Sequence, residues 1–314
     1  MVTVSVPGKV ILMGDHAVVH GKPGLIAAIN KRLTVSIEHH KTFQVISDES
    51  GDYVRHAVET VASHYKVGNI PNIKVTVVSD IPSGYHLGSS AAVAVATVGA
   101  CMYFLKKIWN PAAINQLAYE VEKYTHKTPS GVDNTAITFG GFLWYRKELE
   151  FLRSFWQLPL KLSPALNHFF IIDTGRPKEN TGEMVAYVKS KILNPKSKSK
   201  ILRAFDENEQ QTKRIAQALK EQDDAELMGA IKAGERTLED MGVVRRQVWS
   251  ILRRIESSGG AAKILGGGGV KEGVGFLLAY HPDQKKLDSI VKTLGYPMEK
   301  ISLGEEGVRL EKKS

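Results

Sequence analysis

Hydrophobic positions along the first hundred residues follow two different periods. Residues 2–6 alternate apolar and polar, as in a strand with one buried face, and residues 10–12 resume the pattern after a Pro-Gly break. β-Branched runs at 33–37 and 73–78 predict further strands, whereas apolar residues recur at helical spacing over 53–65. Strands and helices are therefore mixed in this part of the chain.

Residues 81–105 form a long stretch without charge, so a membrane-spanning helix must be considered. It contains no Lys, Arg, Asp or Glu and is long enough to cross a bilayer. However, it starts with a polar loop at 82–86 and continues through Ser and Ala, which contribute little to transfer into lipid. We therefore expect a buried helix from about Ser89, followed by a second helix over 111–124 whose proline suits the first turn.

The pattern changes after residues 142–145. Helical spacing in segments rich in Lys, Glu, Gln and Ala dominates from 182 to about 255. This change, in a chain too long for one core to grow easily, predicts two domains, residues 1–155 and 156–314. The last expected elements are strands at 262–265 and 274–280, a helix at 283–294, and short strands near 301 and 308.

Composition narrows the class of protein. The chain is 43% hydrophobic and 24% charged, which is ordinary for a globular protein and argues against disorder. Its one cysteine, Cys101, lies in an apolar run, so no internal disulfide and no cysteine metal cage can form. The N-terminus has neither the basic nor the apolar region of a secretory signal. We expect a cytoplasmic location.

A formal net charge of +9 favours an anionic partner, but charge alone does not choose among nucleic acid, membrane phosphate and phosphorylated metabolites. The densest basic stretch is Lys196, Lys198, Lys200 and Arg203. It follows a proline and has no interleaved aromatic residues, which favours a solvated helix start over a nucleic-acid groove. We expect neither a nucleic-acid nor a membrane partner.

The first candidate site is the loop of small residues at 82–91 that leads into the charge-free helix. The first amides of a helix have no internal partner and carry the positive end of its dipole, so Gly88, Ser89 and Ser90 could seat phosphates. The hydroxyl of Ser90 could also ligate Mg²⁺. An ordinary serine N-cap is the alternative.

The second candidate is the turn Pro-Ser-Gly-Val-Asp-Asn at 129–134, which displays Asp133 in a polar loop. Glu122 lies at the end of the preceding expected helix. Phosphoryl transfer needs one carboxylate for a metal and another for the hydroxyl proton, so this pair favours chemistry over a plain turn.

The third candidate is Lys9, which follows the Pro-Gly break in a buried strand and could neutralise charge on a transferring group. His16 and His20 lie four residues apart, but no Glu lies between them and no third ligand is evident. Substrate contact or packing is therefore favoured over zinc. The glycines at 266–269, flanked by expected strands, allow close approach to a ligand or form a tight turn.

Several nucleotide-binding signatures are missing from the sequence. There is no G-x-x-x-x-G-K-[ST] loop, no complete G-x-G-x-x-G, and no H-R-D or D-F-G motif. The hypotheses of a P-loop protein, a Rossmann protein or a protein kinase therefore lose their main support.

Four segments together resemble the GHMP-superfamily kinases, named for galactokinase, homoserine, mevalonate and phosphomevalonate kinases, and within them the mevalonate kinase family. Their order and spacing extend the resemblance over nearly the whole chain. The segments are Pro7-Gly-Lys-Val-Ile-Leu-Met-Gly-Asp-His-Ala-Val-Val-His-Gly21, Leu87-Gly-Ser-Ser-Ala-Ala92, Pro129-Ser-Gly-Val-Asp-Asn134 and Lys263-Ile-Leu-Gly-Gly-Gly-Gly269.

The resemblance implies a two-domain α+β fold. The N-terminal domain would be like ribosomal protein S5 domain 2, the C-terminal domain would be an α/β sandwich, and the nucleotide would bind between them. The implied reaction is phosphorylation of the 5-hydroxyl of mevalonate by ATP with Mg²⁺, in the mevalonate route to isoprenoids. A related kinase acting on a phosphorylated mevalonate or another small hydroxy acid is the alternative, and a homodimer is possible.

The resemblance also implies residue roles. Asp133 matches the catalytic aspartate and Lys9 the lysine beside it. Ser90 and Glu122 match the Mg²⁺ ligands, and Asp15 and His16 fall where the family contacts its acceptor. The residues expected to bind ATP are Gly84, Leu87, Gly88, Ser89, Ser90, Ala91, Gly267 and Gly268.

One further residue comes from chemistry rather than resemblance. The acceptor's carboxylate needs a cation, and we select Arg146, a short distance past the Asp133 turn. Three departures from the family bear on substrate identity and nucleotide affinity. Asp15 replaces a usual Glu, His86 replaces a usual glycine of the phosphate loop, and the glycine-rich loop is shortened with Leu265 in place of a usual threonine.

Two other classes of function remain as alternatives. S5-like folds also bind RNA, so a nucleic-acid-binding protein is one. A non-catalytic ATP sensor is the other, and the joint presence of Lys9, Glu122 and Asp133 argues against it.

Overall fold

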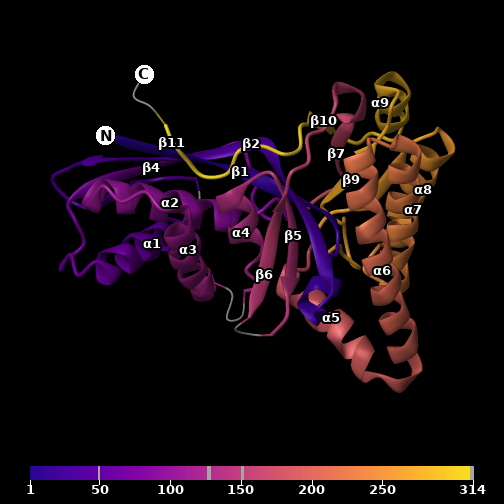
Figure 1. The fold of residues 1–314 in the computed structure, drawn as a ribbon, viewed down its shortest axis with the longest axis horizontal. Helices are drawn as coiled ribbons and strands as arrows, with labels where there is room; N and C mark the ends of the chain where they lie inside the picture. Colours follow the sequence, from indigo (N-terminus) through magenta and orange to yellow (C-terminus); the bar gives the residue numbers. More distant parts are fainter. Residues whose placement is uncertain (49, 126–128, 150–151, 312–314) are drawn as a thin grey trace.

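The computed structural model describes residues 1–48, 50–125, 129–149 and 152–311, and its elements form two sheets flanked by helices (Figure 1). The first sheet has seven strands, with the central order β11-β1-β2-β4-β3 and with β5 and β6 added beside β2. Its strands are β1 (Val2–Met13), β2 (Pro23–His39), β3 (Gln44–Ile46), β4 (Ile73–Ser79), β5 (Phe142–Lys147), β6 (Arg153–Leu158) and β11 (Arg309–Leu310).

The long antiparallel pair of β1 and β2 forms the centre of this sheet. The expected break at Pro7-Gly8 is a shift of register within one continuous strand, where Pro7 pairs with Arg32 and Gly8 with Ile29. Strand β2 begins at Pro23, well before the expected run at 33–37. Its first half is buried on both faces, so its side chains do not alternate and give no two-residue period.

Four helices accompany the first sheet: α1 (Gly51–His64), α2 (Ser89–Lys106), α3 (Pro111–Thr125) and α4 (Val132–Phe139). Helix α2 is the one helix in the described ranges that is long and apolar enough to cross a membrane. It packs against α1, α3, β1 and β2, and 72% of its apolar window is buried inside the fold. The charge-free stretch is therefore a core helix, as the sequence predicted.

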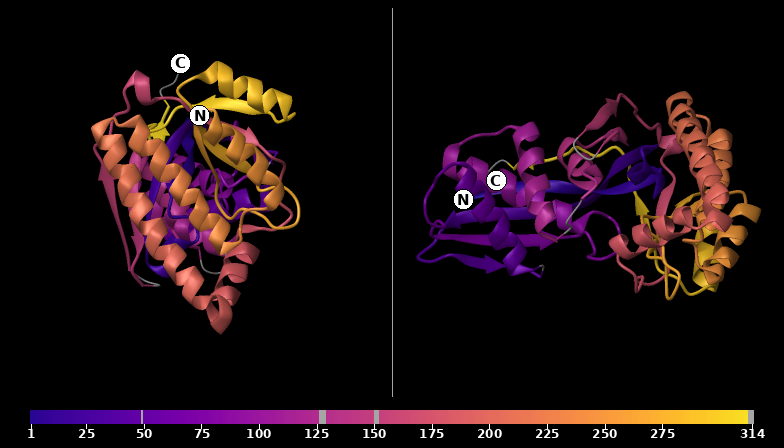
Figure 2. Two further views of the ribbon diagram at one scale, coloured as in Figure 1. Left: turned by 90° about the vertical axis from the view of Figure 1, so that its right-hand side faces the viewer. Right: turned by 90° about the horizontal axis from the view of Figure 1, so that it is seen from below.

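The second sheet has four strands in the order β10-β7-β9-β8. Helices α5 to α9 pack around it, and Figure 2 shows the long α6 and α7 side by side at one end of the molecule. The strands are β7 (Phe169–Asp173), β8 (Ala261–Ile264), β9 (Phe276–Tyr280) and β10 (Met298–Ile301), and the helices are α5 (Thr181–Leu193), α6 (Pro195–Glu221), α7 (Asp224–Met241), α8 (Arg246–Ser257) and α9 (Gln284–Thr293).

Local capping signals divide the helical region that the sequence predicted as one block. The side chain of Asn180 caps α5 in a capping box with Glu183, and Asn194 caps α6 just before Pro195. Asp223 caps α7. Each cap satisfies amides at a helix start, so each helix begins where its cap lies.

One hydrophobic cluster joins the two halves of the chain, and a second one lies mostly within the later half. The largest cluster of buried residues contains β1 and β2 together with Ile215, Leu219, Leu227 and Ile231 from α6 and α7. The chain also returns to its start, because β11 pairs with β1 through Val4 and Leu310. The division at residue 155 stays a prediction, since the final strand belongs to the first sheet.

Candidate functional site

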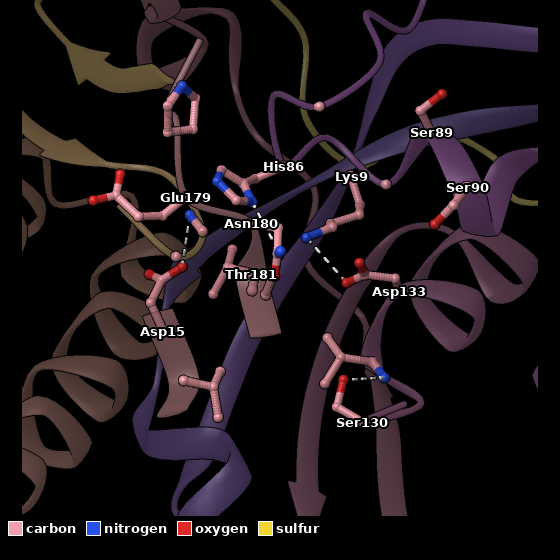
Figure 3. Close-up of a pocket in the computed structure, with 18 of the residues that line it drawn as sticks. Lys9, Asp15, His86, Ser89, Ser90, Ser130, Asp133, Glu179, Asn180 and Thr181 are labelled. Carbon is pink, nitrogen blue, oxygen red and sulfur yellow. Dashed lines mark hydrogen bonds and ion pairs between the residues drawn. The ribbon is translucent and has the colours of Figure 1, made fainter. Parts of the chain in front are cut away.

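A pocket of about 630 Å³ lies where the two sheets meet. Its walls come from β1, the start of α4, the loop before α2, the segment at 176–181 that leads into α5, and the first glycines of the loop at 266–269 (Figure 3). Segments from both halves of the chain thus converge on one cavity, and its size is in the range of small-molecule sites.

The loop before α2 presents an open helix N-terminus to this pocket. Gly88 is the N-cap residue with φ 83°, and α2 starts at Ser89. The amides of Ser90 and Ala91 donate to no group in the described part of the chain. The cap is therefore a glycine with no side chain, rather than the serine N-cap that was the alternative, and an anion can approach the amides.

Close packing fixes this loop on β1. The backbone amide of Lys9 donates to the carbonyl of Leu87 at 3.0 Å. A Cβ at Gly88 would lie 2.9 Å from Ile137 Cδ1 and 3.2 Å from Lys9 Cγ, so only glycine fits at this positive φ. Ser90 and Gly84 line the pocket, whereas Leu87 and Ala91 are buried behind it.

Lys9 and Asp133 meet inside the pocket, as Figure 3 shows, with Lys9 Nζ 3.0 Å from Asp133 Oδ1. Lys9 projects from the interior of β1 and is 3% exposed, whereas the Asp133 side chain is 38% exposed. Asp133 is in the first turn of α4, after Gly131 at φ 80°. The aspartate is therefore held by a buried cation and still open to a ligand.

Asp15 and His16 follow β1 at the edge of the pocket and are both buried. Asp15 Oδ2 is 2.7 Å from Lys263 Nζ, and its Oδ1 accepts from the amide of Gly266 at 2.9 Å. His16 Nε2 lies 3.0 Å from the carbonyl of Gly267 and donates to it, because a carbonyl can only accept. Burial lowers the pKa of His16, so the ring is neutral and its buried Nδ1, which has no partner among the described residues, is an acceptor.

His86 fills the space between the phosphate loop and the glycine-rich loop. A Cβ at Gly266 would lie 2.4 Å from His86 Cβ, and His86 Nδ1 is 3.2 Å from Thr181 Oγ1. Burial and the nearby charge of Lys9 lower the pKa of His86 to about 4. The ring is thus neutral at physiological pH and closes the pocket without adding charge.

Comparisons with known proteins indicate the family to which this chain belongs. The family model described as the GHMP kinases N terminal domain matches residues 52–141. A mevalonate kinase of Archaeoglobus fulgidus is 34% identical over 84% of this chain and 88% of its own length. A mevalonate kinase of Pyrococcus abyssi is 30% identical over 99% of this chain and 98% of its own length.

The chain belongs to the mevalonate kinase family of the GHMP kinases. A crystal structure of mevalonate kinase superposes with TM-score 0.80 at 22% identity, over 97% of this chain and 99% of that one. The structure of the L. major mevalonate kinase in complex with R-mevalonate gives TM-score 0.80 at 22% identity, over 96% of both chains. The family and the two-domain α+β fold expected from the sequence are confirmed.

Arg146, Glu122 and Gly268, which the sequence predicted for the site, lie outside the pocket lining, as do the buried Leu87 and Ala91. Arg146 Nε donates to the carbonyl of Gly21 at 2.8 Å and is 3.4 Å from Glu148 Oε1. Glu122 on α3 is buried and accepts from the hydroxyl of Tyr53. Gly267 lines the pocket, but Gly268 packs against the carbonyl of Val243, which a Cβ would approach to 2.2 Å.

Sequence reasoning missed the segment at 176–181, which forms one wall of the pocket. Arg176 is exposed and makes no ion pair or hydrogen bond within the described residues. Its guanidinium lies over the phosphate loop, because a Cβ at Gly84 would come within 2.6 Å of Arg176 Nε. A Gly-Arg-Pro turn after the apolar run at 169–172 was the available signal.

A buried carboxylate, Glu235 on α7, lies beside the Asp15–Lys263 pair. Its Oε2 accepts from the amide of Ile264 at 2.9 Å, and its Oε1 has no partner among the described residues. Burial raises the pKa of Glu235 to about 8. The native state therefore retains a proton that the unfolded chain releases near 4.5, so this group lowers stability as pH rises from 4.5 to about 8.

We expect Glu235→Gln to flatten this loss of stability. The amide oxygen can still accept from Ile264, but it carries no titrating proton. Thermal unfolding between about pH 5 and pH 8 should show a smaller fall in Tm for the variant than for the parent. The exposed Glu221→Gln is the matched control and should follow the parent. Parallel pH curves for Glu235→Gln and the parent would contradict the protonation of Glu235.

Proposed function

We propose that this protein transfers the γ-phosphoryl group of ATP to the 5-hydroxyl of mevalonate, giving 5-phosphomevalonate for isoprenoid synthesis. The observation that carries the proposal is the Lys9–Asp133 pair, which faces the open N-terminus of α2 across one pocket. Relatives named mevalonate kinase that match this chain over most of their length support the choice of acceptor.

The arrangement suits phosphoryl transfer because this reaction requires alignment and charge neutralisation more than covalent chemistry. The α2 amides would hold the ATP phosphates, and Lys9 would offset charge on the moving group. A bond forms between the acceptor oxygen and the γ-phosphorus as the bond to the bridging oxygen breaks and ADP leaves with the electron pair. The hydroxyl proton passes to Asp133, a carboxylate within reach of a pocket-bound hydroxyl.

We also propose a Mg²⁺ ion that arrives with ATP, with Ser90 and Glu122 as the protein ligands. No group of three or more His, Cys, Asp or Glu in the described ranges is arranged to hold a metal, so phosphate oxygens would complete the shell. Ser90 lines the pocket, whereas Glu122 is buried at the end of α3, outside the pocket lining, and accepts from the hydroxyl of Tyr53. The assignment of Glu122 therefore rests on the sequence resemblance. A hydroxyl and a carboxylate are the oxygen donors that Mg²⁺ prefers, and the ion would neutralise charge on the β- and γ-phosphates.

For the acceptor, the unpartnered Nδ1 of His16 could take a hydrogen bond from a substrate hydroxyl. The acceptor carboxylate needs a cation, and Arg176 suits this role better than Arg146. Arg176 lines the pocket and makes no ion pair within the described residues, whereas Arg146 is engaged by Gly21 and Glu148 outside it.

A cytoplasmic location and a homodimer remain part of the proposal. The single buried cysteine suits a reducing compartment. Nucleic acid and membrane are not among the proposed partners, because the basic stretch around Lys198 lies on the exposed surface of α6, away from the pocket.

The activity test is an acceptor panel. ADP release from ATP and Mg²⁺ should be measured with mevalonate, phosphomevalonate, homoserine and galactose, and mevalonate should give the largest kcat/KM. A higher kcat/KM for phosphomevalonate would make the protein a kinase of the phosphorylated acid. No turnover with any acceptor, together with tight ATP binding, would favour a sensor.

Asp133→Asn should lower kcat by about 10²-fold or more, because the amide cannot accept the hydroxyl proton. ATP binding, measured by calorimetry without acceptor, should persist, since the α2 amides are unchanged. The exposed Asp52→Asn, in the first turn of α1, is the matched control and should keep wild-type turnover. Wild-type turnover in Asp133→Asn would remove this residue from catalysis.

Arg176→Gln should raise the KM for mevalonate by about tenfold or more, the loss expected for one charge-assisted hydrogen bond. The KM for ATP should change less, and Arg146→Gln should leave both within about twofold. The reverse result, with only Arg146→Gln impaired toward mevalonate, would restore Arg146 as the carboxylate-binding residue.

A further inference from the structure

A fully buried ion pair joins the two sheets directly behind the pocket. Asp15 follows β1, and Lys263 lies in β8, a strand of the other sheet. Their side chains are both 0% exposed and 2.7 Å apart. Burying two charges is costly, so such a pair persists only where its geometry and its other hydrogen bonds are good.

Those other hydrogen bonds are all made. Lys263 Nζ donates to Asp15, to the carbonyl of Ile11 at 3.1 Å and to the carbonyl of Ile264 at 2.6 Å, which uses its three protons. The second oxygen of Asp15 accepts from the amide of Gly266 at 2.9 Å. Asp15 therefore has its best acceptor positions occupied by the protein itself, although it lies at the edge of the pocket.

The contacts of Asp15 continue into the glycine-rich loop. Gly266 is the first residue of this loop, and Asp15 holds its amide. The next carbonyl, of Gly267, accepts from the adjacent His16. Two consecutive residues after β1 thus hold two consecutive residues of a loop that comes from the far end of the chain.

The held loop presents a donor to the pocket. Gly267 lines the cavity, and its amide donates to no group in the ranges that the structure describes. Ser90 lines the same cavity from the start of α2, and its amide likewise donates to no group in the described ranges. A triphosphate between them would receive hydrogen bonds from both sides only if the loop stays where Asp15 and Lys263 hold it.

We propose that Asp15 is a positioning residue for the nucleotide: through its ion pair with Lys263 it fixes the glycine-rich loop against the ATP phosphates, and it does not bind the acceptor. This inference rests on the proposed function, because it takes ATP as the nucleotide that binds in the pocket. It replaces the acceptor-binding role that the sequence resemblance suggested for this residue. His16, with its unpartnered Nδ1, keeps the acceptor role.

The test separates nucleotide binding from acceptor binding. For Asp15→Asn, the Kd for ATP, measured by calorimetry without acceptor, should rise about tenfold or more, because the loop loses the charged partner that anchors it. The KM for mevalonate at saturating ATP should stay within about threefold. A rise in the mevalonate KM with an unchanged ATP Kd would overturn the proposal, as would no change in either.

Removing one charge of a buried pair can prevent folding, so a second variant removes both. Asp15→Leu with Lys263→Met leaves no unpaired buried charge and should fold, as circular dichroism can check. Because the two residues act as a unit, the double variant should weaken ATP binding about as much as the worse single variant. Wild-type ATP affinity in the folded double variant would overturn the proposal.

Glu235→Gln is the matched control, because it alters a buried carboxylate of the same cluster that contacts Ile264 and not the glycine-rich loop. Its Kd for ATP should stay within about twofold of the parent. Since ATP binding is measured without acceptor, the result holds even if the acceptor panel names another substrate. Failure of the panel and failure of this proposal are therefore distinguishable.

Discussion

The site depends on one constraint: a lysine amine inside a protein must have a carboxylate and further acceptors, because an unpaired buried charge is too costly to keep. The constraint applies twice along β1. Lys9 projects from the strand and is paired with Asp133 on α4, and Asp15 at the end of the strand is paired with Lys263 on β8. Each pair brings to β1 a segment that lies far away in the sequence, and together they define opposite walls of one pocket.

The two pairs differ in what they leave accessible. Asp133 is 38% exposed, so one end of the first pair faces the pocket and can act on a ligand. The second pair is 0% exposed on both sides, and its remaining hydrogen bonds go to the backbone of Ile11, Ile264 and Gly266. An accessible carboxylate beside a buried cation suits proton transfer, whereas a fully satisfied buried pair suits holding two segments in register.

The phosphate loop and the glycine-rich loop meet through His86, which the sequence resemblance marked as a departure from a usual glycine. The residue adopts φ 64°, a conformation that costs a side chain some strain. The ring is packed against Gly266, and burial with the nearby Lys9 charge keeps its pKa at about 4. Gly266 and the imidazole of His86 are thus packed so closely that a side chain at Gly266 would overlap the ring.

The sequence by itself determined the core helix from about Ser89. It also predicted the helix-start anion seat, Lys9 and Asp133, because these rest on local patterns of polarity, glycine and turn residues. It could not determine which distant groups meet. The packing of the two sheets decides three such contacts. It places Arg176 in the pocket wall, it pairs Asp15 with Lys263, and it leaves Arg146 outside the pocket. Such contacts join residues far apart in the chain, and neither periodicity nor turn chemistry carries information about them, since both are properties of neighbouring residues.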